Sequence, residues 1–310
     1  MGRIIPCYTI AKNNWKRGWH MFDTTEMGAL FKKFRLSKNL TLKDVAGDFL
    51  SVSFLSKFER GESEISLSRF LLLLEKLDVS IEEFYGILAN ERATATEKLL
   101  DKVSSAFYQG NSFALEKFHQ AEMKKYEETK QKTFLYNAIM IESFLVNLTN
   151  QPIANEKMMA ISDYLFSIEQ WGKRELIIFG NSLSALNDKV IEALAREILF
   201  KTTLFGSNEA NQKARIELLI NIAAIFLERD LLDLAKNYLE LLQQLGIPET
   251  ALYDRMEYQF VLGIYLFKSG KKEQGKQKMT AVLATLKTLE AENLRLAHER
   301  VYEELINSTI

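Results

Sequence analysis

The amino-acid sequence predicts an all-α protein, and three observations lead to this fold class. Leu, Glu, Lys and Ala dominate the composition while Val and Thr are modest, which favours helices over strands. Only three prolines occur in 310 residues, so long uninterrupted helices are permitted. Apolar residues make up 47% of the chain, enough to build a substantial core. At this length we expect two unequal domains.

Charge, cysteine and histidine content exclude several classes of protein. The net charge is −1, so any DNA affinity has to come from a local patch rather than from the whole surface. The single cysteine, Cys7, excludes an internal disulfide framework and fits a reducing cytoplasm. The histidines are scattered without partners at metal-ligand spacing, so we expect no metal site and no cofactor. No apolar run approaches the ~20 residues of a membrane span, so no membrane contact is expected.

Residues 1–22 are predicted to be a translated leader or a disordered arm. They lack the apolar stretch and the small-residue cleavage site of a signal peptide. The run Lys16-Arg17-Gly18 can be spelled by purine-rich codons resembling a ribosome-binding site, shortly before Met21. We therefore hypothesise that Met21 is the natural start, and the intact mass of the native protein would test this. The alternative is a genuine arm that touches DNA phosphates.

Residues 23–88 are predicted to form five short helices separated by clear turns. The apolar side of the first helix carries Met27, Leu30, Phe31, Phe34 and, after a break, Leu40. Thr41 caps a second helix, Leu42 to Phe49, with Asp44 completing a capping box. Ser51 caps a third helix, Val52 to Arg60, which Gly61 closes in a left-handed conformation. A fourth helix runs from Leu67 to Leu77, and Ser80 and Glu83 begin a fifth.

The layout of the second and third helices predicts a helix-turn-helix. The run from Ser51 to Glu62 resembles the recognition helix of lambda-repressor-like domains. Leu55 and Phe58 are expected to face the core, which leaves polar side chains for the major groove. The candidate DNA-binding residues are Lys38, Ser51, Ser53, Phe54, Ser56 and Lys57.

Phe54 and Glu59 need separate treatment within this helix. An exposed Phe54 packs on a thymine methyl group, whereas the alternative is burial in the core. Glu59 would repel DNA if it were exposed, and in resembling domains this acid pairs with an arginine near the end of the first helix. Arg35 matches that position, so Arg35 and Glu59 are predicted to form a structural ion pair.

The weak charge of this module predicts a dimer. Acidic residues slightly outnumber basic ones between Met21 and Asn90, and phosphate neutralisation supplies much of DNA affinity. Two modules that engage half-sites about one helical turn apart would compensate. We therefore expect a homodimer on a palindromic promoter site in double-stranded DNA.

The rest of the chain is predicted to be a linker, residues 89–97, followed by a degenerate tetratricopeptide-like helical solenoid, residues 98–310. Breaks often recur at ~35–40 residues, as expected for stacked helix pairs. They fall at Gly110-Asn111, Asn150-Gln151-Pro152, Trp171-Gly172, Gly206-Ser207, Gly246-Ile247-Pro248 and Ser269-Gly270. The stretch Tyr258 to Gln274, with Gly263 and the following Gly275, resembles a tetratricopeptide turn.

A solenoid of this kind has a concave face that commonly receives an extended peptide. Amide side chains there hold a peptide backbone, and arginine is a natural partner for a carboxylate. The candidate peptide-binding residues are Arg174, Asn181, Asn221, Arg255 and Gln259. Seven residues separate the first pair and four the last, so each pair is expected to share a helical face. The alternative is a satisfied core asparagine or a solvated arginine at each position.

Two stretches of the sequence resemble the Rgg regulators of streptococci and their relatives. One is Phe58 to Ser66 with Arg69, and the other is Asp163 to Gly172, followed by Glu175 and Gly180-Asn181. The resemblance implies a homodimeric transcription regulator whose repeat domain binds a short, secreted and re-imported peptide. Some relatives link their DNA-binding domains through a cysteine where this chain has Leu67, so that link is absent here. Many have a polar residue in place of Phe54.

Three other readings compete with a peptide-controlled regulator. One is an interaction scaffold whose helix-turn-helix is vestigial, and another is a regulator that needs no peptide. An enzyme is not expected, because the sequence offers no nucleophile-base pair, glycine-rich phosphate loop or metal cluster.

Overall fold

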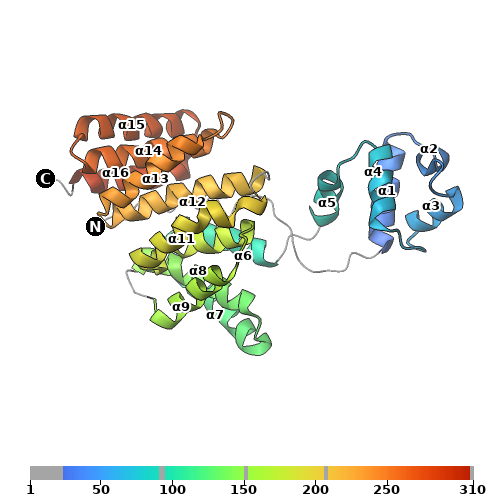
Figure 1. Cartoon of the computed structure of the whole chain (residues 1–310), viewed down its shortest axis with the longest axis horizontal. Coiled ribbons are helices and arrows are strands. Elements are labelled where there is room, and N and C mark those ends of the chain that lie inside the picture. Colours follow the sequence, from blue (N-terminus) through green and yellow to red (C-terminus); the bar gives the residue numbers. More distant parts are fainter. Residues whose placement is uncertain (1–23, 91–94, 150–152, 206–208, 308–310) are drawn as a thin grey trace. The chain divides into compact units, whose positions relative to one another are not determined.

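The computed structural model describes residues 24–90, 95–149, 153–205 and 209–307, and all its regular elements are helices (Figure 1). The predicted all-α class is confirmed for these residues. The leader expected over 1–22, with its proposed start at Met21, lies outside them. No described helix combines the length and apolar character needed to cross a membrane. Among the described residues, no three His, Cys, Asp or Glu side chains gather where they could hold a metal ion.

Two compact units divide the chain, one ending at Lys98 and the other beginning at Leu99. The smaller unit contains α1 (Thr24–Ser37), α2 (Leu42–Ala46), α3 (Val52–Glu59), α4 (Leu67–Lys76) and α5 (Ile81–Asn90). The large unit contains α6 (Ala95–Tyr108), α7 (Ser112–Thr129), α8 (Lys132–Thr149), α9 (Asn155–Ser167), α10 (Lys173–Ser182), α11 (Asp188–Lys201), α12 (Glu209–Glu228), α13 (Leu232–Leu245), α14 (Leu252–Lys268), α15 (Lys272–Thr288) and α16 (Glu292–Asn307), with short 3-10 helices η2 (Leu183–Ala185) and η3 (Thr203–Phe205). The ends of the expected linker, residues 89–90 and 95–97, are helical.

The five helices predicted for the smaller unit are present, and their aromatic side chains form its core. Phe31, Phe58 and Phe84 are essentially inaccessible to solvent. The ring of Phe70 contacts all three, at centroid distances of 5.0 to 6.4 Å. These contacts are edge-on or tilted, as aromatic quadrupoles favour. Four rings from α1, α3, α4 and α5 therefore fix the relative positions of those helices.

The predicted caps are confirmed, whereas the end of the second helix was predicted wrongly. Thr41 and Asp44 form the reciprocal capping box, and the Ser51 hydroxyl accepts the Phe54 amide at 3.1 Å. Gly61 has the expected left-handed φ of +73°. The prediction extended the second helix to Phe49, but α2 ends at Ala46 because Gly47 adopts φ +54°, ψ −150°, outside the helical region.

The large unit is built from successive helical hairpins, such as α7 with α8, α12 with α13 and α14 with α15. The alternate helices α8, α10, α12 and α14 also contact one another in succession, which is how stacked repeats share a core. Helix α12 is buried without interruption from Ile216 to Leu227. It therefore forms the centre of the unit.

Three turns of this unit were missed in the sequence. They lie at Lys130, Asp230 and Glu290, which have φ values of +54° to +57°. Each divides one predicted interval into two helices, so the ~35–40-residue spacing reflects hairpins. Every break expected from the sequence contains Gly, Pro or Asn, residues that often mark such turns. These three positions carry none of them.

The tetratricopeptide-like stretch places two glycines where two helix backbones meet. A Cβ atom on Gly275 would lie 2.6 Å from the Gly263 carbonyl oxygen and 2.6 Å from the Phe267 amide nitrogen. A Cβ atom on Gly263 would lie 2.8 Å from the Met279 side chain. The two glycines therefore allow α14 and α15 to approach more closely than any side chain would permit.

Candidate functional site

Helix α3 has a buried side and a polar side, as its sequence predicts. Leu55 and Phe58 are fully buried in the core of the smaller unit. Ser51, Ser53 and Lys57 are exposed, and Ser56 is half-buried. The polar face of α3 therefore consists of three hydroxyls and one lysine, groups that can bond phosphates or base edges.

Phe54 was considered either as an exposed residue that contacts DNA or as a residue of the core, and its position lies between the two. It is half-buried, and the guanidinium carbon of Arg69 on α4 lies 6.0 Å from the centre of its ring. It is thus neither a core residue nor a freely exposed one. An arginine over the face of an aromatic ring is a weakly favourable arrangement that positions a cation beside α3.

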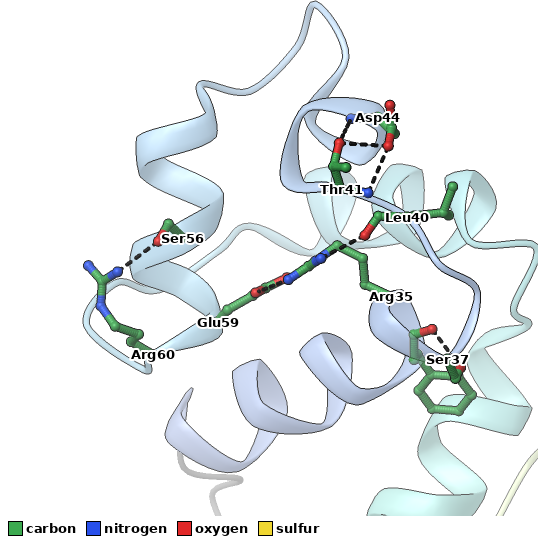
Figure 2. A network of polar contacts seen from close by, with 9 residues as sticks. Arg35, Ser37, Leu40, Thr41, Asp44, Ser56, Glu59 and Arg60 are labelled. Atoms are coloured by element: carbon green, nitrogen blue, oxygen red, sulfur yellow. Dashed lines mark hydrogen bonds and ion pairs between the residues drawn. The ribbon is translucent and has the colours of Figure 1, made fainter.

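Besides Ser51, whose hydroxyl caps α3, two candidate DNA-binding residues are engaged within the chain. Lys38 Nζ donates to the Asp78 carbonyl oxygen at 3.0 Å, in the turn between α4 and α5. Ser56 Oγ accepts from Arg60 Nη1 at 2.7 Å (Figure 2). The same guanidinium donates two bonds to Glu62, at 2.7 and 2.8 Å. A lysine ammonium has three N–H donors and the Ser56 hydroxyl acts here only as an acceptor, so both side chains can still donate to DNA.

The orientation of α3 depends on a buried ion pair. Arg35 Nε and Nη2 donate to the two oxygens of Glu59 at 2.6 and 2.8 Å, and Arg35 Nη1 donates to the Leu40 carbonyl at 2.7 Å. Figure 2 shows this guanidinium between α3 and the turn that leads to α2. The hydrogen bonds that Arg35 donates to Glu59 raise the pKa of Arg35, so the guanidinium stays charged. It joins α1, α3 and the intervening turn in one network.

A glycine allows this close packing of α1 on α3. A Cβ atom on Gly28 would lie 2.0 Å from the Phe58 carbonyl oxygen. No side chain fits at that distance, so Gly28 sets the separation of the two helices.

In the large unit, the candidate peptide-binding residues fall in three places instead of one. Arg174 is exposed in a hollow of about 820 Å³ formed by α8, α9 and α10. It donates to the Thr133 hydroxyl at 3.1 Å, beside the stacked rings of Tyr136 and Tyr164, whose centres are 4.5 Å apart. Asn181 is buried, so the seven-residue spacing does not bring it to the same open surface as Arg174.

Arg255 and Gln259 share one face, as their spacing predicts, and line a hollow of about 590 Å³ between α14 and α15. Arg255 donates to the carbonyl oxygens of Pro248 and Ile247 at 3.0 and 2.7 Å. Gln259 accepts from Lys278 Nζ at 2.6 Å. This hollow carries two cationic side chains and no acidic one among its lining residues.

The two asparagines are buried rather than displayed. Asn181 makes a weak contact of 4.0 Å from its amide nitrogen to the Met140 sulfur. Asn221 lies on α12 with an exposed fraction of 8%. A peptide could contact either one only if the surrounding helices moved.

Sequence reasoning missed a cluster of buried charged residues that crosses alternate helices. We call it the polar seam, and its members are Lys173 on α10, Lys213 and Glu217 on α12, Asp254 and Glu257 on α14, and His298 on α16. All except Lys213 are buried. A visible signal was Glu217, which interrupts the apolar run from Ile216 to Ile220 in the buried part of α12.

One end of the polar seam is paired. His298 Nε2 lies 3.0 Å from Glu257 Oε1, and His298 Nδ1 lies 2.8 Å from the Leu294 carbonyl oxygen. Burial opposes protonation of His298, but the Glu257 carboxylate and the carbonyl outweigh it and raise the pKa of the imidazole. This end of the seam joins α14 to α16.

The other end of the polar seam is poorly paired. The closest cation to Glu217 is Lys213, whose Nζ is 3.8 Å from Oε1, beyond hydrogen-bond distance. Burial, together with the neighbouring Asp254 carboxyl, raises the pKa of Glu217 to about 8. Burial also raises the pKa of Asp254, against the opposing effect of Lys213. Two carboxyl groups therefore lie in an apolar environment that disfavours their ionised forms.

The stretch Asp163 to Gly172 forms a corner between α9 and α10. Trp171 is fully buried and donates from its indole nitrogen to the Leu165 carbonyl at 3.1 Å. Lys201 Nζ donates to the carbonyls of Leu165, Phe166 and Ile168 at 2.8 to 3.3 Å. Glu175 accepts from the Gly172 amide at 3.0 Å and from the Tyr164 hydroxyl at 2.7 Å. These polar groups hold the corner together.

Comparisons with known proteins match both units. The family model for the carboxyl-terminal domain of the helix-turn-helix transcriptional regulator Rgg matches residues 116–300, and a helix-turn-helix model matches residues 31–84. The crystal structure of the Streptococcus dysgalactiae SHP pheromone receptor Rgg2 is similar, with 29% identity and a TM-score of 0.72 over 90% of this chain and 99% of that one. A PrgX/cCF10 complex shares the fold, at 18% identity and a TM-score of 0.69 over 91% and 93% of the two chains.

Proposed function

Because the chain belongs to the Rgg family of helix-turn-helix transcriptional regulators, we propose that it binds a palindromic promoter site as a homodimer under the control of a short peptide. In this proposal the smaller unit contacts DNA through α3, and the large unit binds the peptide and joins the subunits. The protein acts in the cytoplasm and catalyses no reaction. The predicted domain limits, 23–88 for DNA binding and 98–310 for the repeats, belong to the same proposal.

The geometry of α3 is the observation that carries the proposal for DNA. The helix presents Ser53 and Lys57, four residues apart, on one exposed face, with Ser51 at its amino-terminal cap, while the Arg35–Glu59 pair fixes its opposite side. A rigid helix with a short polar face is what insertion into the major groove requires. Phe54 and the adjacent Arg69 extend this face toward α4.

DNA binding is testable with the intergenic DNA upstream of the gene, by fluorescence anisotropy across a salt series. We expect Lys57→Ala to weaken binding and to lower the salt slope by about one, because one phosphate contact is lost. Lys76→Ala, which removes an exposed lysine from α4, is the control and should change neither. Wild-type protein that fails to retain this DNA, or any promoter in chromatin immunoprecipitation, would favour the scaffold with a vestigial helix-turn-helix.

Exposed leucines on α4 support the homodimer. Leu67 is 68% exposed, and Leu71 and Leu72 are each more than 40% exposed. Leu67 also stands where the family resemblance places a cysteine that links two DNA-binding domains. Analytical ultracentrifugation should show a dimer, and Leu67→Lys should weaken DNA binding through the loss of paired half-sites.

Peptide control is supported by the stacked helices and by the similar receptors. The similar structures include Rgg2, a receptor for the SHP pheromone, and a complex of PrgX with cCF10. A peptide changes regulation only if it binds one arrangement of the dimer better than another. Spent culture medium should therefore change the promoter occupancy of the protein in chromatin immunoprecipitation. Occupancy that is indifferent to medium would leave a peptide-independent regulator.

A further inference from the structure

The polar seam contains buried acceptors that its own lysines do not satisfy. Both carboxyl oxygens of Glu217 lack a hydrogen-bond partner among the described residues, and so does Oδ1 of Asp254. Glu217 is completely buried, and Asp254 is 1% exposed. Most buried polar atoms in folded proteins are paired, so three unpaired oxygens on two adjacent helices call for an explanation.

The chemistry of the unpaired atoms indicates which kind of ligand group would pair with them. The unpaired atoms of Glu217 and Asp254 are carboxyl oxygens, and once ionised these groups only accept hydrogen bonds; Glu257 Oε1 and His298 Nε2 also lack a hydrogen bond of good geometry, but they lie 3.0 Å from each other. An ammonium group supplies three donors and a guanidinium group five, and neither has an acceptor to leave unsatisfied. A hydrogen bond that joins two ions is also about twice as strong as a neutral one. The oxygens therefore fit a positively charged ligand group better than an amide or a carboxylate.

Lys213 indicates how such a group would reach the carboxyls. Its side chain is 38% exposed, whereas the Glu217 side chain beside it is completely covered. At 3.8 Å from Oε1 its ammonium contributes charge but no hydrogen bond. A long lysine side chain can turn outward into water at little cost, which would uncover Glu217.

From this geometry we infer that the polar seam binds the positively charged group of the regulating peptide, which displaces Lys213 and donates hydrogen bonds to Glu217 and Asp254. The group is an ammonium or guanidinium, from the peptide's amino terminus or from a lysine or arginine side chain. This inference rests on the proposed peptide control. It adds the chemical class of the ligand and locates its recognition on α12 and α14.

Proton release accompanies binding in this scheme. The groups facing Glu217 are Lys173 from α10, Lys213 from α12 and Asp254 from α14. Asp254 in turn faces Glu257, which His298 of α16 contacts. Because the pKa of Glu217 is raised to about 8, its carboxyl is largely protonated near neutral pH in the free protein. A bound cation favours the ionised carboxylate, so binding releases a proton and the apparent affinity rises as the pH approaches 8.

The test uses immobilised full-length protein and a synthetic library of random octapeptides. One half of the library has free amino termini, and the other half is acetylated there. Captured peptides are sequenced by mass spectrometry. The variant Glu217→Gln/Asp254→Asn removes both charges and keeps the side-chain shapes. Glu240→Gln is the control, because it removes an exposed carboxylate from α13 that pairs only loosely with Lys236, 3.7 Å away. Thermal unfolding verifies that each variant is folded.

We expect the wild type to enrich cationic peptides about tenfold, the ratio that one charge-assisted contact commonly supplies. A preference for the free-terminus half identifies the terminal ammonium, and enrichment of Lys or Arg in the acetylated half identifies a side chain. Glu240→Gln should retain the preference, and the double variant should lose it.

Two results would overturn the inference in distinguishable ways. Wild-type capture of peptides without any preference for a cation, or an unchanged preference in the double variant, would leave peptide binding intact and remove the role of the polar seam. No captured peptide from either half would remove the proposed peptide function, and this inference with it.

Discussion

In the smaller unit the buried carboxylate of Glu59 accepts two hydrogen bonds from Arg35, whereas in the large unit the buried carboxyl of Glu217 accepts none from the described residues. Both residues lie on central helices and are nearly inaccessible to solvent. The difference lies in what surrounds them. Arg35 makes a bidentate contact with the two carboxylate oxygens of Glu59. The nearest cation to Glu217 is Lys213, whose Nζ lies 3.8 Å from Oε1. In the first arrangement every carboxylate oxygen has a hydrogen-bond donor, and in the second the carboxyl oxygens remain available to a ligand.

The largest effect should come from breaking the completed pair. Arg35→Met leaves the Glu59 carboxylate buried and unpaired, and we expect it to lower the free energy of unfolding by about 3–5 kcal/mol. Urea unfolding of the full chain measures this. The double variant Arg35→Met/Glu59→Leu removes both charges and should recover most of the loss. A single variant as stable as the wild type would show that the pair does not hold α3.

A smaller loss is expected at the paired end of the polar seam. His298→Leu leaves Glu257 buried without its imidazole, at a cost of about 2–3 kcal/mol. The raised pKa of His298 makes the wild-type contribution complete below pH 6.5, and it is lost as the pH rises through the folded-state pKa. Thermal unfolding from pH 6 to 9 should show this dependence in the wild type and not in the variant.

His119→Leu is the matched control for that measurement. His119 lies 3.3 Å from Glu142, but Glu142 also has Lys157 at 2.6 Å. The carboxylate therefore keeps a partner after the substitution, and its loss of stability should be clearly smaller. Equal losses in the two histidine variants would show that a second cationic partner on the carboxylate does not reduce the effect.

At the unpaired end the sign should reverse. Glu217→Gln is expected to stabilise the protein by about 2 kcal/mol at pH 8. The folded-state pKa is about 8 and the ordinary value is 4.5, so the stability of the wild type falls as the pH rises between these values. Glutamine does not titrate, so the difference between variant and wild type should grow with pH in urea unfolding.

Glu122→Gln provides the contrast for this reversal. Glu122 is buried but accepts from Asn137 at 2.8 Å and from Lys125 at 2.5 Å. Removing its charge should destabilise the protein, because those donors lose a charged acceptor. If Glu217→Gln and Glu122→Gln both stabilised the protein, hydrogen bonding of the buried carboxyl would not decide the sign of the effect.

The smallest effect should come from a solvent-exposed ion pair that has the same bidentate geometry as Arg35 and Glu59. Arg60 and Glu62 form a two-bond fork like that of Arg35 and Glu59, but both side chains are about half exposed. Water and salt screen such pairs, so Arg60→Ala should leave the thermal midpoint unchanged within error. A fall comparable to that of Arg35→Met would mean that geometry alone sets the energy.

The fold and its local signals could largely be predicted from the sequence. The caps at Thr41 and Ser51 and the left-handed Gly61 follow from short-range chemistry that a few residues determine. The turns at Lys130 and Glu290 could not, because packing of the flanking helices imposes a conformation that lysine and glutamate do not favour; the turn at Asp230 carries a local signal that was overlooked, since aspartate adopts this conformation more readily. Local sequence contains no record of that packing.

The sites were harder to predict than the fold because they depend on burial. Asn181 and Asn221 were candidates for a peptide-binding concave face, with burial in the core as the alternative, and both are buried. Glu257 and His298 are 41 positions apart and meet only through the stacking of α14 and α16. Spacing along one helix predicts a shared face, as for Arg255 and Gln259, but not which partner lies opposite that face.

The corner from Asp163 to Gly172 has a consequence for searching genomes. Its identifying residues are engaged with one another and with Lys201 and Glu175, so they report that a chain has this scaffold. A search with this string would collect relatives regardless of what they bind. Sorting those relatives by the residues aligned with Lys213, Glu217 and Asp254 would group them by the charge of their signal, and neighbouring small open reading frames could then be matched to each group.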